Sequence, residues 1–274
     1  MYLAIDFGAT KTLVACISPE GKIVESAKFP TPHSSYADFI TALEKEIENL
    51  THKDFLACTI SAPGRIDRSI GVVLGYSNLS WINTPLRADV KAIVGCPTFL
   101  ENDTKLAALS EAILLKGKFS KVLYITISTG ISSGLVDNGK LVPELIDSES
   151  GRMMLEHEGT VEEWQSFASG KAIIEKYGKL ASEITDPSAW KDIAHNIALG
   201  MINLIAVVQP DVIVVGGGVG THLDKFEAPL RKELKSYASP LVPIPTIRRA
   251  AHPEEAVIYG CYQLAKEAHE STPK

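Results

Sequence analysis

Residues 4–13 have the sequence AIDFGATKTL, in which two apolar segments flank an acidic residue and a turn of small residues. We predict a strand over residues 2–5 that ends at Asp6 and a second strand over residues 12–17. Such a turn exposes backbone N–H groups that suit a phosphate chain, and Asp6 could hold a magnesium ion, directly or through water. A strand follows this turn, whereas a helix follows the Walker and GxGxxG motifs, so the segment matches neither of them. An ordinary hairpin capped by an Asp explains the segment equally well.

Length and composition indicate a soluble globular protein of one large or two medium domains. The chain has 274 residues, of which 45% are hydrophobic and 22% are charged, and these values are ordinary for that class. A net charge of −6 argues against a nucleic-acid partner, because such proteins need a basic surface. No apolar run is long enough to span a bilayer, and the chain enters a strand without a signal peptide, so we expect no membrane partner.

The four cysteines are far apart in the sequence, and at least three lie in or beside apolar, strand-like runs. This usage is typical of reduced core residues in a cytoplasmic protein rather than of a disulfide framework. The residues are Cys16, Cys58, Cys96 and Cys261.

The first hundred residues are predicted to be mostly strands around one helix. The helix spans residues 35–50, where Phe39, Leu43 and Ile47 recur at helical spacing. Further strands are expected over residues 22–29, 55–60 and 98–100, with a loop between the last two, and a second helix over residues 105–116.

A second strand–turn–strand unit begins near residue 121. We predict a strand over residues 122–127, a glycine- and hydroxyl-rich turn (STGISSG) over residues 128–134 and a returning strand over residues 135–136. Helices are expected over residues 168–208 and 253–268, and an apolar strand over residues 211–215 leads into Gly216-Gly217-Gly218 and another helix. The repeated hairpin start, followed by helices, predicts an α/β fold of two lobes around a central cleft.

Segments that occur in order along nearly the whole chain resemble motifs of the ROK family of sugar kinases and regulators. They are Asp6–Lys11 (D-x-G-G-T-K in the family), Ala62–Gly64 (A-P-G), Asn78–Trp81 (N-L-x-W), Glu101–Asp103 (E-N-D), Ser128–Ile131 with Gly134 (G-T-G-I-G-x-G), Ser169-Gly170, and Gly216–Gly218. One such motif would be weak evidence, but their number and order make the resemblance specific.

The resemblance implies two ribonuclease-H-like lobes of the actin-like ATPase type, within the actin–hexokinase–acetate-kinase superfold. We expect an N-terminal α/β lobe over residues 1–104 and a nucleotide-binding C-terminal α/β lobe over residues 105–253. A terminal helix within residues 254–274 is expected to pack back on the first lobe. The resemblance also implies a homodimer formed through the second lobe.

The chain departs from the family where the family has G-E-x-G-H and a cysteine-rich zinc loop. Glu149 and Gly151 are present, but Arg152 replaces the His, and no cysteine occurs between Cys96 and Cys261. The family's Cys3His site therefore cannot be built, and we expect a zinc-free member with a shortened loop. Because the resemblance gives the His and Glu contacts with the sugar, this departure leaves sugar specificity open.

Asp103 is the candidate catalytic residue. Phosphorylation of a sugar hydroxyl requires a group that accepts its proton, and a positioned carboxylate can do so. The residue is expected at a helix N-terminus, where the helix dipole favours the ionised form; a plain N-cap Asp is the alternative.

The resemblance suggests further sugar contacts around this base. They are Gly64, Asn78, Asn102 and Glu149, with Asp103 itself. Amides and carboxylates suit sugars because each can engage two hydroxyls. Glu149 lies in an acidic run, so a solvated loop explains it as well. Arg152 could pair with Glu149, contact the sugar or point outward.

The candidate nucleotide contacts are glycines and hydroxyls of the two turns. Gly8, Thr10 and Lys11 belong to the first turn, and Thr129 and Gly130 belong to the second. Serines replace family glycines in the second turn, so we expect a tighter loop or a lower nucleotide affinity. Gly216, Gly217 and Gly218 are expected to let the chain approach the adenosine, although a strand-to-helix turn that merely needs glycine is the alternative.

Several tempting residues are interpreted as structural. His195 lies in an apolar helix with Ile193 and Ile197, which favours a core histidine over a ligand. His157 is expected in a polar loop, and Trp164 and Phe167 are expected to pack the shortened loop.

The sequence thus predicts an ATP- and Mg²⁺-dependent kinase of a hexose or hexose derivative. A sugar-binding sensor of the same family that has little or no turnover is the alternative. A helix-turn-helix is not expected, because the chain begins at the first phosphate strand. The sequence names neither the sugar nor the hydroxyl, and it leaves open a phosphate donor other than ATP.

Overall fold

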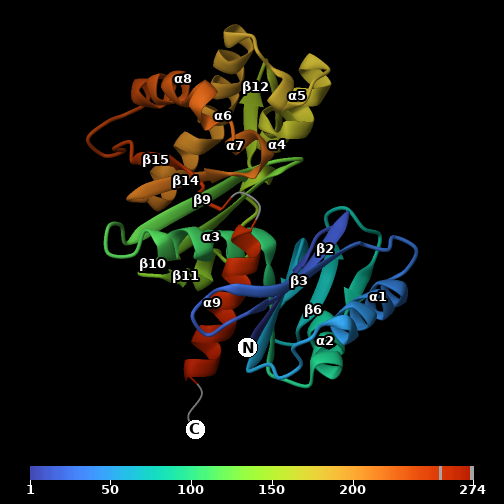
Figure 1. Cartoon of the computed structure of the whole chain (residues 1–274). Coiled ribbons are helices and arrows are strands. Elements are labelled where there is room, and N and C mark those ends of the chain that lie inside the picture. Colours follow the sequence, from blue (N-terminus) through green and yellow to red (C-terminus); the bar gives the residue numbers. More distant parts are fainter. Residues whose placement is uncertain (253–254, 272–274) are drawn as a thin grey trace. The chain divides into compact units, whose positions relative to one another are not determined.

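The computed structural model describes residues 1–252 and 255–271, and the chain divides into two compact units (Figure 1). Unit 1 comprises residues 1–110 and 254–274, and unit 2 comprises residues 111–253. Each unit has its own sheet and its own hydrophobic core.

Unit 1 contains a five-stranded sheet in the order β3-β2-β1-β4-β8. Its strands are β1 (Tyr2–Phe7), β2 (Lys11–Ile17), β3 (Ile23–Pro30), β4 (Ala57–Ala62) and β8 (Thr98–Asn102). The first three form an antiparallel meander, and β4 and β8 extend it with parallel pairing. The mouth of the first turn therefore lies beside the carboxyl ends of β4 and β8.

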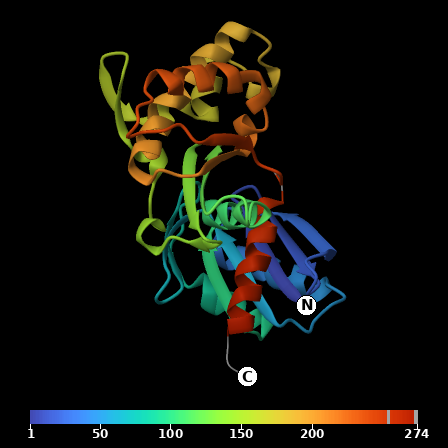
Figure 2. The same ribbon diagram turned by 90° about the vertical axis from the view of Figure 1, so that its left-hand side faces the viewer.

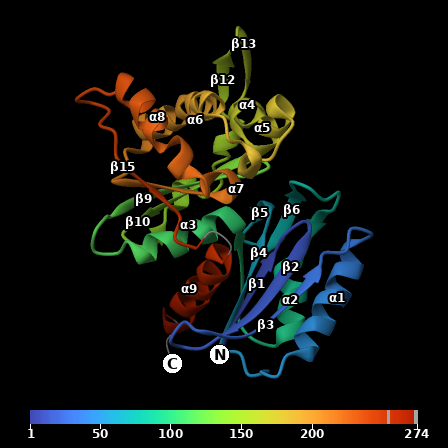
Figure 3. The same cartoon turned by 45° about the horizontal axis from the view of Figure 1, so that its top comes forward.

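Side chains on β1 alternate between two buried faces. Leu3, Ile5 and Phe7 pack into the core on the side of α1 (Tyr36–Asn49) and α2 (Leu86–Val94). Tyr2 and Ala4 pack on the opposite side against α9 (Ala256–Ser271). Figure 3 shows α1 and α2 on one side of the strands and α9 on the other, and Figure 2 shows α9 in red beside the blue strands.

The helix of residues 35–50 was correctly predicted. Ser35 is the N-cap of α1, its hydroxyl accepts from the Asp38 N–H at 3.1 Å, and Phe39, Leu43 and Ile47 are buried. The final helix was expected to start at residue 253, which lies outside the described residues; α9 begins at Ala256. All four cysteines are buried and free, as predicted.

The segment between β4 and β8 is not the loop that was expected. It forms an antiparallel sheet of β5 (Gly64–Asp67), β6 (Val72–Tyr76) and β7 (Ile82–Thr84), followed by α2. The prediction also ended β4 too early, because Ser61 and Ala62 continue the strand and pair with β8. Each of these short strands has a single buried position, and two of them include glycine, so no long apolar run marks them.

Unit 2 repeats the arrangement of unit 1 with a sheet in the order β11-β10-β9-β14-β15. Its strands are β9 (Lys121–Ile127), β10 (Ile131–Asp137), β11 (Lys140–Leu141), β14 (Val212–Gly216) and β15 (Thr246–Arg249). Antiparallel pairing joins β9, β10 and β11, whereas β14 and β15 pair in parallel. The second turn is shorter than predicted, because residues 131–134 already belong to β10.

Helices enclose the core of unit 2 together with a small hairpin. The helices are α4 (Trp164–Ala168), α5 (Gly170–Tyr177), α6 (Pro187–Val208), α7 (Gly217–Gly220) and α8 (Leu223–Ser236). The helix α3 (Asp103–Leu114) lies mostly in unit 1, where Leu106 packs with α9. The hairpin consists of β12 (Met154–His157) and β13 (Thr160–Glu163) and projects from the unit in Figure 3. It was not predicted, and it places His157 in a strand rather than a polar loop.

The expectation that no apolar run is long enough to span a bilayer is wrong for α6, which is long and apolar enough by length and composition alone. Ten of its residues are buried, and several pack in the core of unit 2. Burial in this core accounts for its apolar composition.

Candidate functional site

The first turn of unit 1 is braced by a threonine from the segment after β3. The Gly8 N–H donates to the Lys11 carbonyl at 3.1 Å, and a Cβ at Gly8 would lie 2.9 Å from that oxygen. The Thr31 hydroxyl donates to the Gly8 carbonyl at 2.7 Å and lies 2.9 Å from the Thr12 hydroxyl. Thr10 and Lys11 are exposed, so the turn presents their side chains to solvent.

Asp6 lies at the mouth of this turn next to β4. The Ser61 hydroxyl donates to Asp6 Oδ1 at 3.0 Å and accepts from the Phe7 N–H at 3.0 Å. Burial, and then the charge of Asp103, raise the pKa of Asp6 to about 6, against the lowering effects of Ser61 and Lys11. Two carboxylates thus share a partly desolvated region, and a divalent cation would relieve their repulsion.

Asn102 is the residue that caps α3. Its Oδ1 accepts from the N–H groups of Thr104 at 3.0 Å and Lys105 at 3.3 Å, and its amide nitrogen approaches the carbonyls of Ala62 and Gly64 at 3.5 and 3.4 Å. Both ends of this side chain therefore hold the protein's own backbone.

Asp103 is consequently the first residue of α3 rather than its cap. Its Oδ1 accepts from the Thr104 N–H at 2.7 Å. Position at a helix N-terminus and an N–H donor both favour the ionised carboxylate. The helix also begins two residues earlier than predicted, which places Asp103 on a rigid element.

An ion pair that sequence reasoning missed lies directly before Asp103. Glu101 is buried, and its carboxylate accepts from Arg68 Nε at 2.8 Å and from a second guanidinium nitrogen of Arg68. The Asn102 N–H donates to Glu101 Oε1 at 2.7 Å. This bidentate pair ties the turn after β5 to the end of β8. No local pattern marks this pair in the sequence, because 33 residues separate the partners.

The two other sugar candidates of unit 1 lie in the small sheet and in the segment that follows β6. A Cβ at Gly64 would lie 2.1 Å from the Gly75 carbonyl oxygen, so only glycine fits there. Asn78 is exposed. The nearby Trp81 is buried and stacks near Phe7, with ring centroids 6.1 Å apart, so it anchors the segment that carries Asn78.

The second turn, in unit 2, is held by the start of α5. The Ser128 N–H donates to the Gly130 carbonyl at 2.9 Å, and the Gly170 N–H donates to the Ser128 carbonyl at 2.6 Å. The Ser169 hydroxyl caps α5 by accepting from the Ala172 N–H at 3.2 Å. Thr129 is exposed at the tip. The Ser169-Gly170 pair therefore has a local role that the motif alone did not reveal.

The glycine turn at the end of β14 lies behind the same residues. Gly217 has a φ of +79°, and a Cβ there would lie 2.5 Å from the Ile127 carbonyl oxygen. A Cβ at Gly216 would lie 2.2 Å from the Tyr124 hydroxyl, whereas nothing lies within 4 Å of one at Gly218. The fold itself therefore requires Gly216 and Gly217, which agrees with the alternative that a strand-to-helix turn merely needs glycine. Gly218 faces open space.

The segment that carries Glu149 lies beside the second turn, near Gly130 and Ile131. A Cβ at Gly151 would lie 2.2 Å from the Ile131 carbonyl and 3.0 Å from Gln165 Oε1, and one at Gly130 would lie 2.9 Å from that same Gln165 oxygen. Gln165 was not singled out from the sequence, which offers no motif for it. Glu149 itself is exposed, and Arg152 pairs with Glu163 at 2.9 Å rather than with Glu149.

The discounted residues divide into two groups. Trp164 is fully buried and donates to the Asn196 carbonyl at 3.0 Å, and Phe167 is buried, so both are structural as predicted. The interpretation of His195 as a core residue is wrong. Its side chain is 47% exposed and lies 2.9 Å from Glu233 of α8.

Comparison with known proteins assigns the family. The model of the ROK family matches residues 2–268. The chain belongs to the ROK family.

Among its relatives is a glucokinase of Streptomyces coelicolor, 25% identical, with 97% of each chain covered. An N-acetyl-D-glucosamine kinase of Salmonella typhimurium is 25% identical, with 95% of this chain and 97% of the relative covered. Among solved structures, a ROK family glucokinase from Streptomyces griseus in complex with glucose and AMPPNP superposes with a TM-score of 0.81. It is 23% identical, with 97% of this chain and 99% of that chain covered.

These findings confirm the predicted family and the actin-like ATPase fold of this ROK chain. They leave the individual site residues as predictions. The structure gathers those residues into two sets, one in each unit. Unit 1 holds Asp6, Gly8, Gly64, Asn102 and Asp103 around the ends of β1, β4 and β8, and unit 2 holds Thr129, Gly130, Gly216 and Gly217 around the end of β9.

Proposed function

We propose that this ROK chain transfers the γ-phosphoryl group of ATP to a hydroxyl of a hexose or hexose derivative, with Asp103 as the general base. The observation that carries the proposal is the position of Asp103 at the first turn of α3, beside a second carboxylate, Asp6. A carboxylate that is held in place suits proton abstraction from an alcohol. The kinase relatives support the phosphoryl acceptor class.

In the proposed reaction, an oxygen of the Asp103 carboxylate takes the proton of the sugar hydroxyl. The sugar oxygen forms a bond to the γ-phosphorus, the bond from that phosphorus to the β–γ bridging oxygen breaks, and ADP leaves with the electron pair. Asn102 caps the helix and so holds Asp103 in place. This gives Asn102 an indirect effect on the sugar, through the position of the base, in addition to the proposed direct contact. The Arg68–Glu101 pair fixes the strand end that carries both residues.

Asp6 fits a role in holding magnesium, directly or through water. Its carboxylate is largely buried, lies near Asp103 and has a raised pKa, which is the environment that a cation neutralises. Magnesium, when bound with ATP, neutralises charge on the phosphate oxygens. Lys11 and Thr10 are exposed at the same turn and are proposed phosphate contacts.

Unit 2 is proposed to bind the nucleotide through backbone rather than through charge. Thr129 and Gly130 offer a hydroxyl and an N–H at the tip of the second turn. Gly218 is exposed, and nothing lies within 4 Å of its Cβ position, so a nucleotide can approach the chain there. We propose that Glu149 and Asn78 contact the sugar and that the sugar loop of unit 2 holds no zinc. A homodimer through unit 2 is proposed from the family resemblance alone, and a cytoplasmic location is proposed from the four free cysteines.

The test is coupled ADP release with MgATP across a panel of hexoses and N-acetylhexosamines. We expect turnover with at least one sugar and a loss of at least about a thousandfold in kcat for Asp103→Asn. The Asn side chain keeps an acceptor for the Thr104 N–H, so the helix start should persist. Asp54→Asn is the control, because Asp54 is exposed in the loop before β4.

Three results would each overturn a part of the proposal. Equal activity of Asp103→Asn and wild type would show that another group is the base. No turnover with any sugar, in a protein that binds one by calorimetry, would favour the sensor alternative. Turnover only with a different phosphate donor would show that ATP is not the donor. Asp103→Asn would then test the base with that donor.

A further inference from the structure

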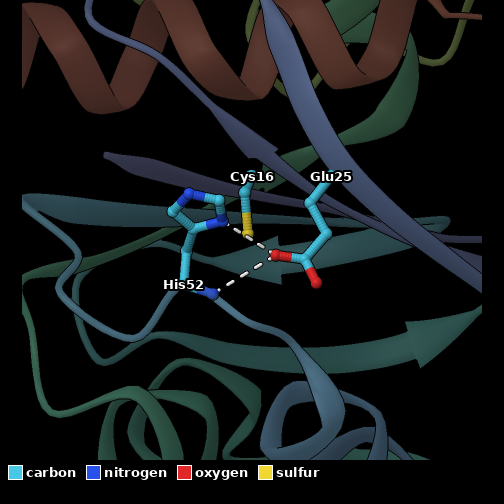
Figure 4. A group of neighbouring side chains, drawn as sticks. All are labelled: Cys16, Glu25 and His52. Atoms are coloured by element: carbon cyan, nitrogen blue, oxygen red, sulfur yellow. Dashed lines mark hydrogen bonds and ion pairs between the residues drawn. The ribbon is translucent and has the colours of Figure 1, made fainter.

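Three side chains of metal-binding types meet in unit 1, away from the first turn. Cys16 is near the end of β2, Glu25 is in β3, and His52 is in the segment between α1 and β4. The cysteine sulfur, a carboxylate oxygen of Glu25 and a ring nitrogen of His52 all lie within 4.8 Å of one another. Figure 4 shows the three groups pointing toward one another from separate elements.

The fold builds this group through backbone interactions. Cys16 and Glu25 face each other in the antiparallel pair of β2 and β3, so their side chains share one face of the sheet. The Glu25 carboxylate accepts from the N–H groups of Thr51 at 2.7 Å and His52 at 3.2 Å. His52 Nδ1 lies 2.9 Å from Glu25 Oε2. The segment that carries His52 is thus docked onto the strand that carries Glu25.

Burial increases from His52 to Cys16. The side chains of His52 and Glu25 are 42% and 22% exposed, whereas Cys16 is fully buried and belongs to the core of unit 1. A cation could therefore enter from the His52 side and reach the sulfur last. The same exposed side leaves room for water as a fourth ligand, as zinc sites with three protein ligands have.

The chemistry of the group also suits a cation. Glu25 supplies a carboxylate next to the sulfur of Cys16 and the imidazole of His52. A cysteine binds zinc as its thiolate, so a metal that binds there must displace the thiol proton.

We propose that Cys16, Glu25 and His52 bind one zinc ion or a similar borderline-soft divalent cation. Sulfur, imidazole nitrogen and carboxylate oxygen are the ligand types that zinc accepts, at distances of about 2.0–2.3 Å. Ligand atoms that already lie within 4.8 Å of one another need to move by only roughly 1 Å to reach such distances. Loss of the Nδ1 contact with Glu25 frees that nitrogen for the metal.

The site would stabilise unit 1 and would not take part in phosphoryl transfer. Cys16 pairs with Leu3 near the start of β1, whereas Asp6 and the first turn are at the other end of that strand. Four residues of strand, about 13 Å, separate Leu3 from Phe7. The expectation of a zinc-free chain was argued only from the family's Cys3His set, so the proposal would restrict that expectation to the sugar loop.

The experiment uses the full chain after treatment with a chelator. Zinc is titrated by calorimetry, and cobalt(II) serves as a spectroscopic probe because its bond to a thiolate gives a near-ultraviolet charge-transfer band. We expect one zinc per chain, release of a proton, a cobalt–thiolate band and a rise in Tm with zinc. None of these measurements depends on kinase activity, so their failure leaves the proposed kinase untouched.

Matched variants separate this site from incidental binding. Cys16→Ala should abolish the cobalt–thiolate band, and His52→Gln should weaken zinc binding at least about tenfold, since loss of even an outer-shell partner costs that much. Cys96→Ala is the control, because Cys96 is another buried cysteine of the same core. His52 is half-exposed, so His52→Gln tests the proposal even if Cys16→Ala destabilises the core.

Absence of a cobalt–thiolate band in the wild-type chain would overturn the proposal. So would zinc affinity that is unchanged in both Cys16→Ala and His52→Gln, because the ion would then bind elsewhere. Loss of binding in Cys96→Ala, with a folded chain, would likewise place the thiolate at a different cysteine.

Discussion

The two strand–turn–strand segments have the same backbone frame but different chemistry. In unit 1, β1 pairs antiparallel with β2 and parallel with β4; in unit 2, β9 pairs antiparallel with β10 and parallel with β14. Asp6 and Thr126 hold corresponding places, each one residue before the end of its strand. One frame therefore carries a carboxylate, and the other carries a hydroxyl.

The residues that support each turn differ in the same way, with hydroxyls at the first turn and glycines at the second. At the first turn the supporting groups are hydroxyls: Ser61 donates to Asp6, and Thr31 donates to the Gly8 carbonyl. Opposite and after Thr126 the chain has Gly216 and Gly217, whose missing side chains let backbone segments approach closely. The first turn thus holds a charge among hydroxyls, whereas the second lets the protein's own segments pack closely behind it.

Of the changes considered for the two turns, removal of the Asp6 charge at the first turn should have the largest effect. The pKa of Asp6, raised from 3.8 to about 6, means that the folded state holds its proton more tightly than the unfolded chain. The associated stabilisation is present below about pH 4 and is lost as the pH rises through about 6. At pH 7.5, Asp6→Asn should therefore raise the free energy of unfolding by up to about 3 kcal/mol, while MgATP turnover falls at least about a hundredfold.

Urea titrations of wild type and Asp6→Asn at pH 5 and pH 7.5 measure this effect. The gap between the two proteins should widen at the higher pH, and added magnesium should narrow it by stabilising only the wild type. A gap that is the same at both pH values would show that the Asp6 carboxylate is not destabilised by its surroundings. The charge of Asp6 would then not make the two turns differ in their contribution to the free energy of unfolding.

Addition of one methyl group behind the second turn should have the next largest effect. Gly217→Ala places a Cβ 2.5 Å from the Ile127 carbonyl at a φ of +79°, and we expect a loss of about 2 kcal/mol in stability. Gly218→Ala is the matched control for stability, because its Cβ meets open space, and it should change stability by less than about 0.5 kcal/mol. Urea unfolding checks both; equal losses in the two variants would contradict a close backbone approach at Gly217.

The frame of each unit could be predicted because apolar runs end at distinctive residues. The strands that flank Asp6 and the helix with Phe39, Leu43 and Ile47 were found in this way. The pattern failed where elements are short and half exposed, as in β5 to β7 and the hairpin of β12 and β13. Strands of three to five residues with few or no buried positions do not differ from a polar loop in a single sequence.

The error at His195 was avoidable from the sequence. Ile193 and Ile197 are four residues apart and share the buried face of α6, and a residue midway between them points to the opposite face at about 100° per residue. Other parts of the site were out of reach. Arg68 with Glu101, and Thr31 with Gly8, are partners that lie 33 and 23 residues apart, and no local pattern records such pairs. The motifs identified the segments, but the tertiary fold decides which residues support them.

Loss of the threonine brace should give the smallest of the three effects. Thr31 is buried, and Thr31→Val keeps its shape while removing the hydrogen bonds to the Gly8 carbonyl and the Thr12 hydroxyl. We expect a loss of about 1 kcal/mol in stability and a rise of a few-fold in KM for MgATP. Thr31→Ser, which retains the hydroxyl, should restore KM, as measured by the same coupled assay. If Val and Ser behave alike, the hydroxyl does not hold the turn, and the two turns differ in charge but not in how they are supported.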